Sequence, residues 1–212
     1  MKIIFLDIDG VLNGAAVKSK FLWYITYRLN LRKIYYFIED LFNFREPYYS
    51  VHEDKVKMLS EIVNKTGALV VLTSSFRTTL YKDYIAYNND PEHTVFVSDE
   101  IKKMVLLFKK YDIPILDIVP EKNKRRFVNI YQWLMDNKQK YDITNFIILD
   151  DEYEGLGFYY NYDFKYTRSI ITSDSNIKRD ISGRWYCREG IRKIHVRQAI
   201  KKLNSEPLNR YS

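Results

Sequence analysis

The sequence has little of what disulfide-rich, low-complexity or membrane-spanning chains require. Its single cysteine, Cys187, excludes an intrachain disulfide and any zinc site built from several cysteines. Seven glycines and five prolines are too few for a collagen-like or low-complexity chain. No run approaches the roughly 18 uncharged apolar residues of a membrane-spanning helix. Asp7 comes too early for a signal peptide, so we expect an intracellular, cytoplasmic protein in a reducing compartment, without a membrane partner.

The composition is that of a globular protein. Of the 212 residues, 46% are hydrophobic and 29% charged, and 16% are aromatic, which argues against extensive disorder. We expect one domain over residues 1–212. The net charge of +7 is unevenly placed, because residues 160–212 hold 12 basic and 5 acidic residues whereas residues 1–159 hold 22 of each. This basic C-terminal part suits either a phosphate-rich partner or a solvated surface.

Short apolar runs alternate with segments of helical periodicity. Such runs predict strands, and strands buried on both faces are typical of a parallel sheet. Ser50 and Glu53 have the spacing of a capping box, Gly67 ends that helix, and Ser98 is a candidate cap. The predicted strands cover residues 2–7, 68–72, 93–97, 115–119, 146–149 and 169–172. The predicted helices cover parts of 14–50, the segment from Ser50 to Gly67, and then residues 99–111, 124–139 and 191–203. This alternation predicts an α/β fold with a central parallel sheet flanked by helices.

Three predicted strands end in polar clusters, and parallel sheets bind ligands beyond the carboxyl ends of their strands. The clusters are Asp7 with Asp9, residues 73–75, and Asp150 with Asp151. Residues i and i+2 of a strand share a face, so Asp7 and Asp9 would repel each other unless a cation or a shared proton offsets them. Carboxylate-rich clusters of this kind suit Mg²⁺.

These residues carry a resemblance to a known superfamily. Residues 7–13 (DIDGVLN) resemble the first motif of the haloacid dehalogenase (HAD) superfamily, residues 73–77 (TSSFR) resemble the second, and residues 147–151 (IILDD) the fourth. The run VVLTSSFR, Arg126 ahead of Trp133, and the ILDD ending are similar to HAD domains associated with RNA-repair proteins. The chain departs from that pattern at Asn129, where those domains have an acidic residue, and in its larger insertion at residues 14–50.

The resemblance implies a Rossmann-like HAD fold and a role for each carboxylate. Asp7 would be the nucleophile that forms an aspartyl-phosphate, and Asp9 the general acid and base. Mg²⁺ would be held by Asp7, the main-chain carbonyl of Asp9, and Asp150. Asp151 would be a further ligand or would orient a bound water. The acid at Asp9 favours phosphatase or phosphomutase chemistry, since the dehalogenases and cation pumps of the superfamily lack it.

Two further roles leave alternatives open. A hydroxyl of Ser74 or Thr73 would hold a phosphate oxygen, and Ser74 is preferred by its position after the strand. The third motif needs a cation, for which Arg126 is preferred by its spacing to Trp133 and Lys124 is the second choice. Lys122 and Arg125 are the remaining candidates in this basic run.

We therefore expect a Mg²⁺-dependent phosphatase whose substrate is a nucleotide or the end phosphate of RNA or DNA. The aromatic and basic residues of the helical insertion at 14–50, which sits where the superfamily places a cap, suit contact with bases and phosphates. The alternatives are a nucleic-acid-binding protein on a HAD scaffold with no turnover, a phosphatase of small metabolite phosphates, and a receiver-like switch. In receiver domains the paired acidic residues follow the first strand. Here the pair at 150–151 comes about 140 residues after the first strand, which disfavours the switch.

Overall fold

The computed structural model describes residues 1–13, 51–123, 125–151, 168–172 and 190–205. Within these residues the chain forms a five-stranded, all-parallel sheet in the order β3-β2-β1-β4-β5. The strands are β1 (Lys2–Leu6), β2 (Leu69–Leu72), β3 (Ile115–Ile118), β4 (Asn145–Asp150) and β5 (Ser169–Ile171). The helices are α3 (Glu53–Thr66), α4 (Arg77–Asn89), α5 (Asp99–Lys110), α6 (Arg126–Tyr141) and α8 (Lys193–Leu203). The predicted α/β fold with a helix-flanked parallel sheet is confirmed.

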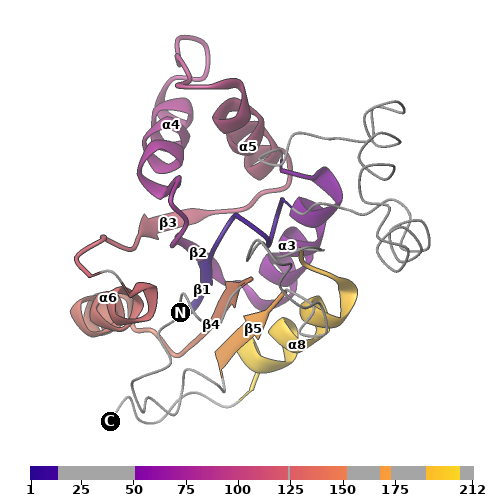
Figure 1. Cartoon of the computed structure of the whole chain (residues 1–212), viewed down its shortest axis with the longest axis vertical. Helices are drawn as coiled ribbons and strands as arrows, with labels where there is room; N and C mark the ends of the chain where they lie inside the picture. The colour runs from indigo at the N-terminus through magenta and orange to yellow at the C-terminus, as the bar shows by residue number, and fades with distance from the viewer. Residues whose placement is uncertain (14–50, 124, 152–167, 173–189, 206–212) are drawn as a thin grey trace, which may run out of the picture.

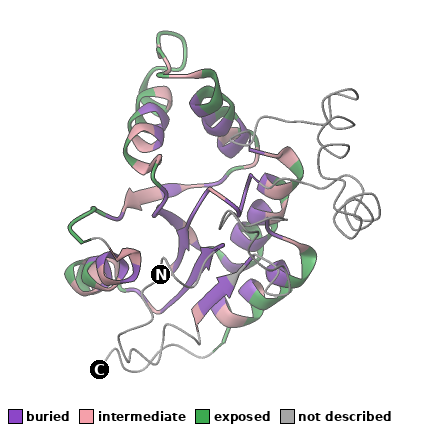
Figure 2. Cartoon of the chain, in the orientation of Figure 1, coloured by how far each residue is buried: buried purple, intermediate pink, exposed green. Residues whose placement is uncertain are grey.

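Helices cover both faces of the sheet (Figure 1). Leu6, Leu72 and Leu149 point to one face, where they pack against α3, α5 and α8. Phe5 and Ile148 point to the other face, where α6 supplies the helical side of the core. Because both faces are covered, the central strands are buried along most of their length, as Figure 2 shows. This double burial explains why the strands are continuous apolar runs in the sequence.

Two helix boundaries follow their sequence signals and one does not. Gly67 ends α3 in the left-handed conformation at φ 66°, and the Ser98 side chain accepts a hydrogen bond from the Ile101 amide at the start of α5. The predicted capping box at Ser50 is wrong, because α3 begins at Glu53 with His52 as its N-cap and no side-chain cap. Glu53 instead faces the end of α5, where it pairs with Lys110 at 2.8 Å.

The middle of the chain differs most from expectation. Helix α4 was not predicted, because it buries only Leu80, Asp83 and Tyr84 and so presents no regular apolar stripe. The extended segment predicted at 93–97 is instead a loop that ends at Val97, whose amide donates to Asp83 at 2.9 Å. The apolar residues of the helix predicted at 191–203 include Ile194, which is exposed in α8, whereas the polar His195 beside it is buried.

Several predictions fall outside the described residues. These are the helical insertion at 14–50, Lys124, Cys187 and most of the basic segment 160–212. Among the helices that are described, none combines the length and the apolar character needed to cross a bilayer.

Candidate active site

Three polar residues meet where β1, β2 and β4 end. The register of these strands places Asp7 between Thr73 on one side and Asp150 on the other. The Asp7 amide donates to the Leu149 carbonyl and the Thr73 amide donates to the Leu6 carbonyl, each at 2.9 Å. Ladder hydrogen bonds therefore continue one residue past the end of β1, which fixes the backbone that carries these side chains.

A cluster of three buried carboxylates lies at this edge. Asp7, Asp150 and Asp151 are 2%, 0% and 4% exposed, and one carboxylate oxygen of each lies within 4.8 Å of the other two. Like charges this close and this far from water require a compensating cation or proton. Oxygen ligands in this number suit Mg²⁺, so the chemistry of the donor set fits the metal that the resemblance implies.

Arg126 partly compensates this negative charge. Its Nη1 atom donates to the Asp7 carboxylate at 2.7 Å and to the Asp150 carboxylate at 2.6 Å. Arg126 is the first residue of α6, the helix packed on the face of the sheet to which Phe5 and Ile148 point. Burial lowers the pKa of the guanidinium, but Asp150 and Asp7 outweigh it and raise that pKa above its ordinary value. Arg126 therefore stays charged between the two acids.

The pKa of Asp7 is raised from its ordinary value of 3.8 to about 7. Burial is the main cause, and the neighbouring charge of Asp150 adds to it. Arg126 opposes the shift but does not cancel it, since one guanidinium faces more than one carboxylate. A second positive charge at this edge would favour the ionised form of Asp7.

Gly10 makes the room that Asp151 occupies. A Cβ atom built on Gly10 would lie 2.3 Å from Oδ2 of Asp151, and Gly10 has a φ of +71°. The Gly10 carbonyl also accepts a hydrogen bond from the Thr172 hydroxyl at 2.7 Å, which ties the first motif to the end of β5. Glycine is therefore required here both by backbone conformation and by space.

We expect Gly10→Ala to lower the free energy of unfolding by at least about 2 kcal/mol more than Gly67→Ala. Gly67 has a similar φ of +66°, but nothing lies within 4 Å of its Cβ position. The Gly67 variant therefore measures the backbone strain alone, and the difference isolates the contact with Asp151. Urea unfolding followed by circular dichroism measures both, and equal losses would contradict the steric argument.

The side chain of Asp9 lies outside the carboxylate cluster. Its Oδ1 accepts a hydrogen bond from Nδ2 of the Asn13 side chain at 2.8 Å. Oδ1 of the same Asn13 side chain accepts a hydrogen bond from the backbone N–H of Gly10 at 2.7 Å. Asp9 is half-buried, whereas Asp7 is fully buried. These bonds hold Asp9 on the turn that follows β1, apart from the three carboxylates that could hold a metal.

The structure distinguishes the two hydroxyl candidates of the second motif. Ser74 is fully buried, and its Oγ accepts a hydrogen bond from the Phe76 amide at 3.3 Å. Thr73 lies beside Asp7 in the register, and its buried Oγ1 has no hydrogen-bond partner among the described residues. A buried hydroxyl without a partner costs free energy, so this atom is poised for a bound group. The Thr73 position therefore fits a phosphate-binding role better than the preferred Ser74.

The basic residues of the third motif are separated by the fold. Arg126 contacts the carboxylates, whereas Arg125 is the N-cap of α6 and Lys122 lies in the loop after β3. Lys124 lies outside the described residues. Asn129, which departs from the resembled pattern, accepts from the Asn123 amide and donates to the Asn123 carbonyl, both at 2.8 Å. These two bonds anchor the loop that leads into Arg126.

Arg77, the last residue of the second motif, also lies at this edge. Arg77 donates to the carbonyls of Thr73 (3.4 Å) and Ser74 (2.8 Å), and it pairs with Glu121 at 2.6 Å. Its guanidinium therefore links the second motif to the loop after β3. In the sequence, Arg77 is visible only as the last residue of the motif TSSFR. Its contacts depend on the fold.

Comparison with known proteins identifies the family. The family described as the HAD domain in Swiss Army Knife RNA repair proteins matches residues 3–169. No curated protein and no solved structure matches the chain. The match covers the three polar clusters, Arg126, nearly all of β1 and the whole of β2, β3 and β4, and it ends at the first residue of β5, so both the superfamily and the narrower resemblance are confirmed. The chain belongs to the HAD domains of Swiss Army Knife RNA repair proteins.

Proposed function

We propose that this chain is a Mg²⁺-dependent phosphatase that hydrolyses a phosphomonoester through an aspartyl-phosphate intermediate on Asp7. The observation that carries the proposal is the placement of Asp7, buried at the carboxyl edge of the sheet beside Asp150, Asp151 and Arg126. A HAD scaffold alone is compatible with other chemistries or with none. A buried nucleophile candidate with a cation and further carboxylates around it favours phosphoryl transfer.

The first half-reaction uses the two acids of the first motif. A carboxylate oxygen of Asp7 attacks phosphorus, the new O–P bond forms, and the bond from phosphorus to the leaving oxygen breaks. Asp9 donates its proton to that leaving oxygen, which departs as an alcohol. Arg126 and the Thr73 hydroxyl face the place of attack and donate hydrogen bonds to phosphoryl oxygens, whose charge they stabilise.

The second half-reaction reverses the roles. Asp9, now ionised, removes a proton from a water molecule, and the oxygen of the resulting hydroxide attacks phosphorus. The bond between phosphorus and Asp7 breaks, which releases inorganic phosphate and regenerates the carboxylate. The bond between Asn13 and Asp9 holds the Asp9 side chain on the turn after β1 during both steps.

Asp7, Asp150 and the carbonyl of Asp9 would hold Mg²⁺, with Asp151 as a further ligand or as an acceptor for a bound water. When bound, the ion would offset the repulsion between phosphate oxygens and carboxylates and would keep Asp7 ionised. The buried carboxylates and the raised pKa of Asp7 support this assignment, because both favour an added cation.

The proposed substrate is a nucleotide or the end phosphate of a nucleic acid. The family description places related domains in RNA repair proteins, which supports a nucleic-acid substrate for this chain. The excess of basic residues in the C-terminal quarter of the sequence is consistent with an anionic partner.

The proposal is tested by Mg²⁺-dependent phosphate release from a panel of substrates. The panel contains oligonucleotides with a 3′- or a 5′-phosphate, mononucleotides, and sugar phosphates. We expect release from a nucleotide or oligonucleotide that stops when a chelator is added. Faster release from sugar phosphates would replace the substrate with a small metabolite. Salt-sensitive oligonucleotide binding with no release at all would favour a binding protein on this scaffold.

Thr73→Val tests the hydroxyl that lies beside Asp7. Valine keeps the shape of threonine and removes only the buried Oγ1, which has no hydrogen-bond partner among the described residues. We expect kcat/KM to fall by about 10- to 100-fold, the cost of one lost hydrogen bond to a charged group. The matched control, Ser74→Ala, removes a hydroxyl that already accepts from Phe76 and should cost less. A larger loss for Ser74→Ala would restore Ser74 as the phosphate contact.

A further inference from the structure

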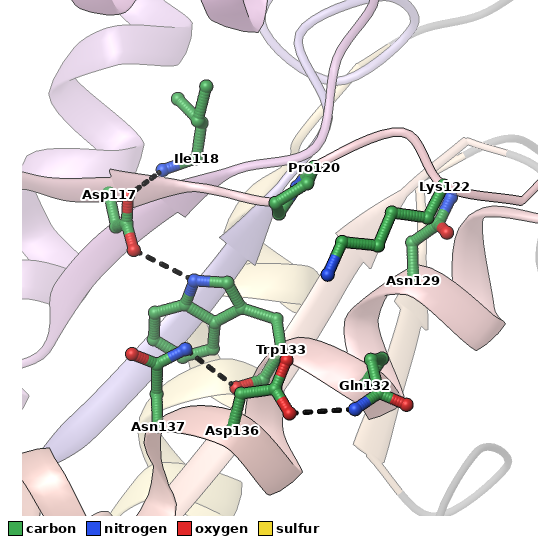
Figure 3. A pocket seen from close by; sticks show the side chains of 9 residues that line it. All are labelled: Asp117, Ile118, Pro120, Lys122, Asn129, Gln132, Trp133, Asp136 and Asn137. Atoms are coloured by element: carbon green, nitrogen blue, oxygen red, sulfur yellow. Dashed lines mark hydrogen bonds between the residues drawn. The ribbon is translucent and has the colours of Figure 1, made fainter.

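A recess lies between the end of β3 and α6 (Figure 3). Its volume is about 190 Å³, and its walls come from the end of β3, the loop that follows, and α6. Trp133 forms part of the floor, and Asp117, Lys122, Gln132 and Asn137 surround it. Sites for drug-sized ligands are larger, at about 300–1,000 Å³, so this recess suits a single ring system.

Helix α6 connects the recess to the carboxylates. Arg126 at its first position reaches Asp7 and Asp150, and Asn129 and Gln132 line the recess one and two turns further on. At 1.5 Å per residue, these two positions lie about 5 and 9 Å along the helix from Arg126. The recess therefore begins about one turn of α6 from the arginine that contacts Asp7.

The polar groups of the recess are both fixed and available. The Asp117 carboxylate accepts from the Ile118 amide and from Trp133 Nε1, each at 2.8 Å, so its orientation is set from two sides. Each carboxylate oxygen has a second lone pair, which leaves Asp117 able to accept again. Figure 3 shows Lys122 extending over the recess, and its ammonium group makes no hydrogen bond or ion pair with the described residues.

The side-chain amides of Gln132 and Asn137 on α6 add further hydrogen-bond acceptors. Gln132 donates to Asp136 at 2.7 Å and Asn137 donates to the Trp133 carbonyl at 2.9 Å, so both use their nitrogen atoms. Their carbonyl oxygens accept no hydrogen bond from the described residues. The recess thus offers a cationic donor on one side and several acceptors on the other, around an apolar surface from Ile118, Pro120 and Trp133.

We infer that this recess binds the nucleobase of the substrate, and that the base is guanine. Guanine presents acceptors at O6 and N7, which a lysine contacts, and donors at N1 and N2, which a carboxylate accepts. Lys122 and Asp117 supply this pair of functions within one recess. Uracil lacks the exocyclic amine that would donate a hydrogen bond to Asp117. This inference rests on the proposed function, because it treats the base and the phosphate as parts of one substrate.

The test is direct binding of guanosine and uridine monophosphates to the full chain, by calorimetry in the presence of a chelator. No turnover is required, so the result is independent of catalysis. We expect wild type to bind the guanosine nucleotide at least about 10-fold more tightly than the uridine nucleotide. Asp117→Asn should remove this preference, and the asparagine oxygen still accepts from Trp133, which protects the fold. Lys122→Ala, at an exposed position, should weaken guanosine binding without affecting the fold.

The matched controls are Asp112→Asn and Lys82→Ala. Asp112 is exposed before β3, about 17 Å along the chain from Asp117, and its φ of 49° tolerates asparagine. Lys82 is exposed on α4. Both controls should keep the guanosine preference. Equal binding of the two nucleotides by wild type, or a preference unchanged in Asp117→Asn, would overturn the inference.

Two further arms separate the related outcomes. Competition by an oligonucleotide ending in a 3′-phosphorylated guanosine, at least as strong as that of the mononucleotide, assigns the recess to nucleic-acid ends. Weaker competition assigns it to free nucleotides. If guanosine binding is selective but no phosphate is released from any substrate, the proposed catalysis fails while the base site stands. If phosphate is released with no base preference, the base site fails while the catalysis stands.

Discussion

Asp7→Asn should abolish Mg²⁺-dependent phosphate release, with kcat at least about 1,000-fold below wild type. The amide cannot form the phosphoryl bond, although its shape matches the carboxylate at this fully buried position. Release of inorganic phosphate under single-turnover conditions measures the effect. The control is Asp9→Asn, which should slow turnover yet leave Asp7 able to accept phosphate. Unchanged release from Asp7→Asn would exclude Asp7 as the nucleophile.

The same substitution should change how stability depends on pH in the absence of metal. The pKa of Asp7 is about 7 in the folded chain and near its ordinary 3.8 when unfolded, so the folded state binds this proton more tightly. Ionising Asp7 therefore costs folded-state stability, which falls as the pH rises from about 4 to about 7 and is then constant. The total loss is on the order of 4 kcal/mol.

Asp7→Asn removes this titration, so the variant should be more stable than wild type above neutral pH. Urea unfolding at pH 5 and pH 8, with a chelator present, measures the difference for both proteins. Added Mg²⁺ should restore wild type more than the variant, because only wild type ionises Asp7. Parallel pH dependence in the two proteins would mean that burial does not raise the pKa of Asp7.

Arg126→Ala should give the second large effect, a loss of folding stability that comes in addition to the loss of its contact with the phosphoryl group. The guanidinium makes hydrogen bonds of 2.7 and 2.6 Å with the side chains of Asp7 and Asp150, both of which are buried. Removing one partner of a buried ion pair costs about 3–5 kcal/mol, because the remaining charges lose their compensation. The partial exposure of Arg126, at 29%, places the expected loss near the lower limit.

Urea unfolding with and without Mg²⁺ distinguishes electrostatics from packing. If charge compensation is the cause, millimolar Mg²⁺ should recover most of the stability lost by Arg126→Ala, since the ion supplies the missing positive charge. Arg126→Lys keeps the charge and should lose less without metal. A loss that Mg²⁺ does not recover would instead indicate that the aliphatic part of Arg126 stabilises α6 by packing.

Much of the site could be predicted from the sequence, because each polar cluster directly follows an apolar run. A buried parallel strand needs apolar residues on both faces, so its ends are marked wherever such a run stops. Asp7, Asp150 and Asp151 followed from this rule, and the structure brings all three together. Helix α4 could not be predicted in this way, because a helix with only three buried residues shows no periodic apolar pattern in the sequence.

The choice among neighbouring residues depended on the tertiary structure. In the sequence, the position after the strand favours Ser74 over Thr73, but the register of β1 and β2 puts Thr73 beside Asp7 and leaves Ser74 to accept from Phe76. Arg126 was preferred in the sequence by its spacing to Trp133, and the structure shows that the start of α6 places it against the carboxylates.

The sequence by itself determined the class of fold, the family, and the types of residue gathered at the edge of the sheet, since these follow from hydrophobic runs and short motifs. The tertiary structure decided which atoms meet. Arg77 forms an ion pair with Glu121, and the absence of a side chain at Gly10 leaves room for Asp151. Asp117 and Lys122 line one recess. Long stretches of chain separate the first two pairs. Contacts between distant segments depend on register and helix packing, and no local pattern in the sequence records either.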